Sequence, residues 1–139
     1  MSTRGTMPAA PAVTPAKHRL LLVDDEGAIL LVVSEYFRRR GYEVVCARGG
    51  EEAKALLAQG DFACVIADLR LTNGHAEEGL AIAAFARERC PAARIVILTA
   101  YDSAIAEKQA ESRKIDALIL KPTSLADMAR VVSDLLEGS

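Results

Sequence analysis

Short apolar runs alternate with longer stretches of helical spacing along most of the chain. The clearest run is Phe62 to Asp68 (FACVIAD), which is almost wholly apolar and ends on a single carboxylate. A run of this length, rich in Val, Ile and Phe, predicts a strand that is buried on both faces. Because such a strand needs helices above and below it, it belongs in a parallel sheet.

The same pattern predicts four more strands and five helices. The further strands are Arg19–Val23, Tyr42–Ala47, Arg94–Thr99 and Ala117–Leu120. Helices are expected from Ile29 up to Gly41, from Gly50 to Gly60, and over Leu80–Arg89, Asp102–Arg113 and Leu125–Leu136, with a polar loop over Arg70–Glu78 and a cap at Thr123 or Ser124. Strands that alternate with helices predict right-handed crossovers and a doubly wound, five-stranded parallel α/β sheet.

Composition narrows the class of protein. A chain of 139 residues with a formal charge of −2 predicts one globular domain and gives no electrostatic reason to bind nucleic acid. No apolar run approaches the roughly 20 residues that span a bilayer. The three scattered cysteines are expected to be buried, reduced thiols, which favours the cytoplasm. Residues 1–17, rich in Pro, Ala and Thr, are expected to form a disordered arm ahead of a domain over 18–139.

Four of the five predicted strands end on reactive side chains. These are Asp24 and Asp25, Asp68, Thr99 and Lys121. Since the carboxyl ends of parallel strands meet at one edge of the sheet, the groups are expected to converge there. Three carboxylates and one lysine leave negative charge uncompensated, and hard oxygen ligands suit Mg²⁺. The pattern therefore predicts a magnesium site with a lysine on its other side.

Four motifs carry a resemblance to a known family. LLVDDE, VIADLRL, IVILTA and LILKP, in this order and spacing, resemble the receiver domain of two-component response regulators over about residues 19 to 137. The resemblance implies the flavodoxin-like strand order 2-1-3-4-5 with helices on both faces. It also implies a phospho-accepting signalling protein that catalyses only its own phosphorylation and dephosphorylation. The chain stops soon after the last predicted helix, so a stand-alone receiver without a DNA-binding or enzymatic output domain is expected.

The resemblance also implies roles for the residues at the strand ends. Asp68 would take a phosphoryl group from a phosphohistidine of a sensor histidine kinase or a histidine phosphotransfer protein. Lys121 would neutralise a phosphoryl oxygen, Thr99 would move its hydroxyl onto the phosphoryl group, and the Lys121-Pro122 peptide would be cis. The implied Mg²⁺ ligands are Asp24, Asp25, Asp68 and the backbone carbonyl of Arg70.

Some positions depart from the family pattern. Leu118 stands where the family has a Tyr or Phe that rotates inward, and the loop after Asp68, which includes His75, is longer than usual. Two alternatives therefore stay open: an adaptor with a pocket that never carries phosphate, and a Mg²⁺-dependent aspartyl-phosphate hydrolase. The hydrolase is disfavoured because the haloacid-dehalogenase-like Asp-x-Asp pattern is missing after the first strand. The downstream protein target and the formation of a homodimer are not determined by the sequence.

One helix carries more apolar residues than a single core face needs. If Ile29, Val33 and Tyr36 face inward, Leu30 and Leu31 should face outward. Two interpretations remain: incidental surface leucines, or a docking patch for a helical kinase or phosphotransfer partner.

Overall fold

The computed structural model describes residues 18–69, 75–99 and 115–137. Strands and helices alternate up to residue 99, and a further strand and helix follow within residues 115–137. The elements are β1 (Arg19–Val23), α1 (Gly27–Arg39), β2 (Glu43–Ala47), α2 (Gly50–Gln59), β3 (Cys64–Leu69), α3 (His75–Arg89), β4 (Arg94–Thr99), β5 (Ala117–Leu120) and α5 (Leu125–Glu137).

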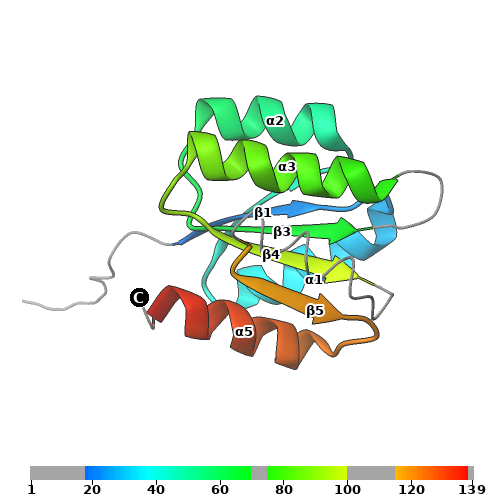
Figure 1. Cartoon of the computed structure of the whole chain (residues 1–139). Helices are drawn as coiled ribbons and strands as arrows, with labels where there is room; N and C mark the ends of the chain where they lie inside the picture. Colours follow the sequence, from blue (N-terminus) through cyan, green and yellow to red (C-terminus); the bar gives the residue numbers. More distant parts are fainter. Residues whose placement is uncertain (1–17, 70–74, 100–114, 138–139) are drawn as a thin grey trace, which may run out of the picture.

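The five strands form one parallel sheet in the order β2-β1-β3-β4-β5. This confirms the predicted fold class and strand order. In register, Val23 lies opposite Ala47 and Ala67, and Thr99 lies opposite Leu69 and Leu120. The strand ends that carry the candidate side chains therefore share one edge, and all the arrows in Figure 1 point toward it.

Helices cover both faces of the sheet, α2 and α3 on one and α1 and α5 on the other (Figure 1). Successive side chains of a strand point to opposite faces, so each central strand contributes to two apolar cores. Leu21 of β1 lies in the core under α2 and α3, whereas Leu20 and Leu22 lie in the core under α1 and α5. This explains why the strands are continuous apolar runs rather than alternating ones.

Several predicted boundaries are wrong, including those of α1, which begins at Gly27 instead of Ile29, and of β2, which begins at Glu43 instead of Tyr42. The FACVIAD strand begins at Cys64, because Phe62 and Ala63 belong to the turn that enters it. The polar loop was predicted to reach Glu78, but α3 already begins at His75. Residues 75–79 (HAEEG) lack the apolar spacing used to find helices; their acidic residues, which suit a helix N-terminus, are the only signal there. The predicted helix over 102–113 lies outside the described residues.

The predicted inward face of α1 is wrong for Ile29 and Leu30, whereas Val33 and Tyr36 pack partly buried against the core and Leu31 is exposed, as predicted. Leu30 is only 6% exposed, whereas Ile29 is 37%, Val32 57% and Leu31 68% exposed. The run from Ile29 to Val33 is apolar throughout, so its spacing alone could not fix the rotation of the helix. The rotation is set by Phe37, which is fully buried. It lies two turns after Leu30 on the same buried stripe of the helix.

The N-terminus of α5 is capped by one of the two predicted residues. Ser124 caps α5, since its Oγ accepts a hydrogen bond of 3.0 Å from the backbone N–H of Asp127.

Among residues 18–69, 75–99 and 115–137, no helix has the length and apolar character needed to cross a membrane.

Candidate functional site

Three consecutive acidic residues form a compact cluster where β1 ends. Carboxylate oxygens of Asp24, Asp25 and Glu26 all lie within 4.8 Å of one another. Asp24 is buried, its Oδ1 accepts a hydrogen bond of 2.9 Å from the backbone N–H of Glu26, and its own N–H donates to the carbonyl of Ala47 at 3.1 Å. Hard carboxylate donors so close together fit a divalent cation such as Mg²⁺. The sequence had assigned no role to Glu26.

A buried ion pair lies at the neighbouring strand ends. Nζ of Lys121 donates to Oδ1 of Asp68 at 2.9 Å, although the two residues are 53 positions apart. The side chain of Asp68 is 2% exposed and that of Lys121 is 33% exposed. The ion pair therefore joins an almost fully buried carboxylate to an ammonium group that is partly exposed.

Thr99 joins this group through the backbone. The N–H of Lys121 donates to the carbonyl of Thr99 at 2.6 Å, and Thr99 itself is buried. The Lys121-Pro122 peptide is cis, as the resemblance implied. Asp68, Thr99 and Lys121, which the sequence placed at three strand ends, thus meet at one edge of the sheet. Arg70, the remaining predicted metal ligand, lies outside the described residues.

A residue that the sequence analysis missed fixes where Lys121 emerges. Oδ2 of Asp116 accepts hydrogen bonds from the backbone N–H of Ile95 at 2.7 Å and from Nη2 of Arg87 at 2.8 Å. In return, the N–H of Asp116 donates to the carbonyl of Ile95 at 2.8 Å. These bonds hold the start of β5 against β4, and because β5 has only four residues, they also set the position of Lys121.

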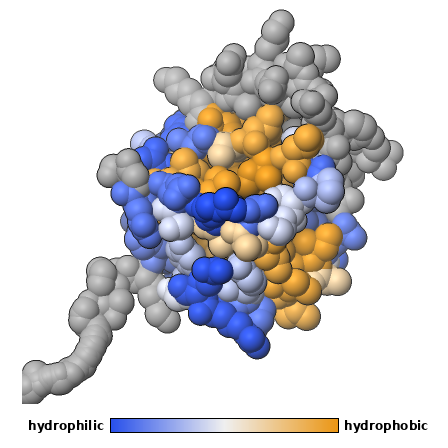
Figure 2. Space-filling view, turned by 90° about the horizontal axis from the view of Figure 1, so that it is seen from below, coloured by the Kyte–Doolittle hydropathy of each residue, from blue (hydrophilic) through white to orange (hydrophobic). Residues whose placement is uncertain are grey.

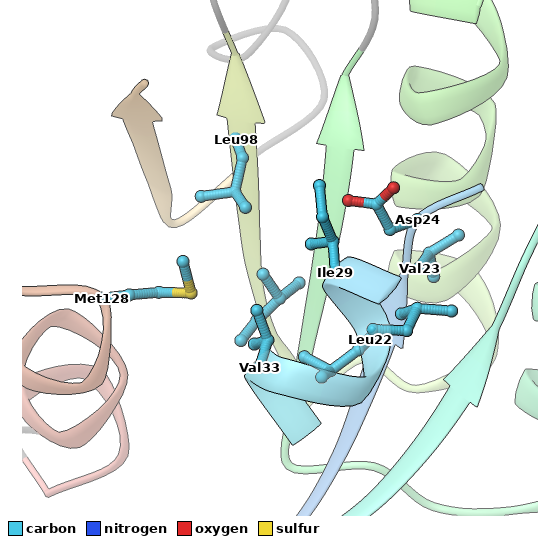
Figure 3. A pocket seen from close by; sticks show the side chains of 9 residues that line it. Leu22, Val23, Asp24, Ile29, Val33, Leu98 and Met128 are labelled. Atoms are coloured by element: carbon cyan, nitrogen blue, oxygen red, sulfur yellow. The ribbon is translucent and has the colours of Figure 1, made fainter. Parts of the chain in front are cut away.

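An apolar groove runs beside the acidic cluster, between α1 and α5. Ile29 and Val33 of α1 line it from one side and Met128 of α5 from the other, with Leu98 of β4 on its floor and the Asp24 carboxylate at one end (Figure 3). Its volume of about 20 Å³ holds a single water molecule and no larger ligand. The groove is therefore a surface feature rather than a substrate pocket.

The cysteines do not supply a second reactive centre. All three are free thiols, and Cys64 and Cys90 are buried, as predicted. Burial, reinforced by the nearby Asp116 carboxylate and opposed by Arg94, raises the pKa of the Cys64 thiol to about 12. A thiol that stays neutral at pH 7 is a poor nucleophile and a poor metal ligand.

The model of the response regulator receiver domain family matches residues 20–133, which is most of the chain. The chain belongs to this family. It is therefore a receiver domain of two-component signalling, a signalling module rather than a classical enzyme, and the partner of such a domain is in general a histidine kinase.

The chain matches only part of the length of its curated relatives. The photosynthetic apparatus regulatory protein RegA of Rhodobacter capsulatus is 32% identical over 113 residues, which cover 81% of this chain and 60% of RegA. The alginate biosynthesis transcriptional regulatory protein AlgB of Pseudomonas aeruginosa is 36% identical over 122 residues, which cover 86% of this chain and 26% of AlgB. The receiver domain thus spans less than two thirds of either relative.

Solved structures of receivers superpose on the same elements. A CheY-like receiver domain from Methanospirillum hungatei is 26% identical with a TM-score of 0.81, over 88% of this chain and 96% of that one. A response regulator from Burkholderia pseudomallei is 28% identical with a TM-score of 0.76, over 88% of this chain and 71% of that one. The latter structure contains a phosphorylated aspartic acid and a calcium ion.

Proposed function

We propose that this receiver domain accepts a phosphoryl group on Asp68 from the phosphohistidine of a sensor histidine kinase or a histidine phosphotransfer protein. The observation that carries the proposal is the ion pair between Lys121 and the buried Asp68, 2.9 Å long, beside an acidic cluster at the end of β1. A buried carboxylate paired with a lysine can act as a nucleophile toward a phosphoryl group, and the lysine and a metal ion would balance the negative charge of that group.

In the transfer, a carboxylate oxygen of Asp68 acts as the nucleophile. A P–O bond to this oxygen forms, the P–N bond to the histidine breaks, and the imidazole leaves with the electron pair, so that an acyl phosphate remains on Asp68. The Lys121 ammonium, already in hydrogen-bond contact with Oδ1, balances negative charge on the phosphoryl oxygens. The low exposure of Asp68 limits the access of water to the acyl phosphate.

The carboxylates of Asp24, Asp25 and Asp68, with the backbone carbonyl of Arg70, would hold Mg²⁺, which supplies positive charge to the phosphoryl oxygens when bound. Support comes from the acidic cluster at the end of β1, where the hard carboxylate oxygens of Asp24, Asp25 and Glu26 lie within 4.8 Å of one another, and from Asp68 at the end of the adjacent strand. The bond from the Glu26 N–H to Asp24 Oδ1 orients one of these carboxylates. Thr99, at the end of β4, would donate its hydroxyl to the phosphoryl group.

Because the phosphohistidine belongs to another protein, a docking surface must adjoin Asp68. The docking patch predicted at Leu30 and Leu31 needs correction, because Leu30 is buried. Ile29, Leu31 and Val32 are the exposed apolar residues of α1, and Ile29 also lines the groove that ends at Asp24. Figure 2 shows apolar side chains gathered on the face that α1 and α5 form. We assign this α1 patch of three residues to a helix of the phosphodonor protein.

Intact-mass spectrometry after incubation with Mg²⁺ and a small phosphodonor tests the proposal. The wild type should gain the mass of one phosphoryl group, and Asp68→Asn should gain none. Asp61→Asn is the matched control, because Asp61 is an exposed aspartate shortly before the same strand. A wild type that stays unlabelled would contradict the proposal and favour an adaptor that never carries phosphate. Label that persists in Asp68→Asn would also overturn it.

A further inference from the structure

Arg48 joins the end of β2 to the acidic cluster at the end of β1. Its Nη2 donates a hydrogen bond of 3.0 Å to the backbone carbonyl of Asp25. The preceding residue, Ala47, accepts a bond of 3.1 Å from the N–H of Asp24. Ala47, the last residue of β2, and Arg48, which follows it, therefore bond to the backbone of Asp24 and of Asp25.

Arg48 is itself held in place on both sides. Its backbone N–H donates to Oε1 of Glu52 in the first turn of α2 at 2.9 Å. Its guanidinium lies over Gly27, the first residue of α1, where a Cβ atom would be 3.5 Å from both Cζ and Nη1. The side chain of Arg48, although exposed, thus lies against the start of α1.

We infer that Arg48 is a positioning residue for Asp25, an inference that rests on the proposed Mg²⁺-dependent function. Asp25 and Glu26 are exposed and lie in the short connection between β1 and α1, next to the buried Asp24. Three adjacent carboxylates repel one another, which favours conformations in which this connection spreads. The bond from Arg48 to the Asp25 carbonyl opposes that movement and keeps the Asp25 carboxylate near its partners.

The direction in which Mg²⁺ affinity changes when Arg48 is removed distinguishes a positioning role from an effect of charge alone. A positive guanidinium close to a cation site repels the cation, so if Arg48 acted through charge alone, its removal would strengthen Mg²⁺ binding. If it acts by holding Asp25, its removal weakens Mg²⁺ binding. We expect the second result.

The test is a Mg²⁺ titration followed by the backbone amide signals of Asp24, Asp25 and Glu26 in the wild type and in Arg48→Met. Methionine keeps a straight apolar stem and removes the donor. The dissociation constant for Mg²⁺ should rise about fivefold, the amount expected for the loss of one hydrogen bond. Arg39→Met is the matched control, because it removes the same charge from an exposed arginine at the far end of α1 and should change nothing.

A kinetic measurement separates positioning from a general loss of structure. In Arg48→Met, the Mg²⁺ concentration for half-maximal phosphorylation should rise by the same factor, while the rate at saturating Mg²⁺ should match the wild type. Equal or tighter Mg²⁺ binding by Arg48→Met, with a normal wild-type titration, would overturn the inference and leave the proposed function standing. A wild type that shows no Mg²⁺ response would instead overturn the proposed function.

Discussion

Asp68 and Asp116 are both largely buried, yet their surroundings suit different tasks. Both oxygens of Asp116 accept hydrogen bonds, from the Ile95 amide and from two arginines, at the end of the sheet where β5 begins. A carboxylate with its lone pairs occupied in this way is a structural anchor. Asp68, near the opposite edge, is paired with a lysine that is one third exposed. We expect this partly exposed lysine to contact an incoming phosphoryl oxygen, which the fully bonded Asp116 carboxylate could not do.

The pH dependence of stability should report the burial of Cys64. Burial raises the pKa of this thiol from 9.0 to about 12, so the unfolded chain releases the proton at a lower pH than the native chain does. The contribution of Cys64 to stability is therefore complete below about pH 9 and falls as the pH rises toward 12. Between about pH 8 and pH 10, the free energy of unfolding of the wild type should fall more steeply than that of Cys64→Ala, by on the order of 1 kcal/mol.

Urea unfolding at the two pH values measures this difference. Cys64→Ala shifts the absolute stability because it leaves a small cavity, but only the change with pH enters the comparison. Parallel pH dependences in the two proteins would show that the native thiol ionises as readily as the unfolded one.

Residue types and strand ends were sufficient to single out the carboxylates, the hydroxyl and the lysine of the site. Asp68 and Lys121 each follow a clear apolar run, and a parallel sheet brings such ends together. Arg48 and Asp116 could not be found in this way. Their importance depends on hydrogen bonds to backbone atoms of distant segments, and the sequence contains no pattern for such bonds.

At the scale of elements, α1 is the helix whose orientation decides the most about function. With Leu30 and Phe37 buried, the most exposed members of the α1 patch are Leu31 and Val32. They lie at the end of the helix next to the acidic cluster, where the phosphodonor protein has to approach. Large apolar side chains that are exposed to water at this place indicate a site where a partner protein covers them.

Leu31→Glu/Val32→Glu should slow phosphotransfer from a histidine kinase that labels the wild type by about tenfold or more, because charged side chains would be buried in the contact. Labelling by a small phosphodonor should be unchanged, since Asp68 and its neighbours are untouched. The measurement is the rate of Asp68 labelling with each donor.

Ala55→Glu/Ala58→Glu is the control for this pair. It adds the same charge at exposed positions of α2, on the other face of the sheet. Equal slowing by both double variants would mean that net charge, and not the α1 patch, governs the contact. An unaffected rate in Leu31→Glu/Val32→Glu would rule out docking on this helix.

The apolar pattern predicted the elements well where the pattern is sharp. β1, β4 and β5 have the predicted bounds, because each apolar run ends on a charged or polar residue. The apolar pattern failed to predict structure where apolar residues are too few, or where they are consecutive. The first turn of α3 has no apolar spacing, and the uninterrupted apolar run in α1 fits several rotations of the helix. Tertiary contacts with the sheet, which the local sequence pattern does not contain, determine the start of α3 and the rotation of α1.

For the whole molecule, the alternation of strands and helices was enough to predict the parallel sheet, and the family resemblance supplied its strand order. That topology is the reason that residues spread over nearly a hundred positions form one site. From this topology we propose that Asp24, Asp25, Asp68, Thr99 and Lys121 act together on a phosphoryl group at the carboxyl edge of the sheet.

The most direct test is to add Mg²⁺ and beryllofluoride, a phosphoryl mimic, and to follow the backbone amide signals. The signals of Asp25, Asp68, Thr99 and Lys121 should shift together in the wild type and in Asp61→Asn, and stay unchanged in Asp68→Asn. No shift in the wild type, or the same shift in Asp68→Asn, would contradict the claim that Asp68 is the acceptor at the centre of this site.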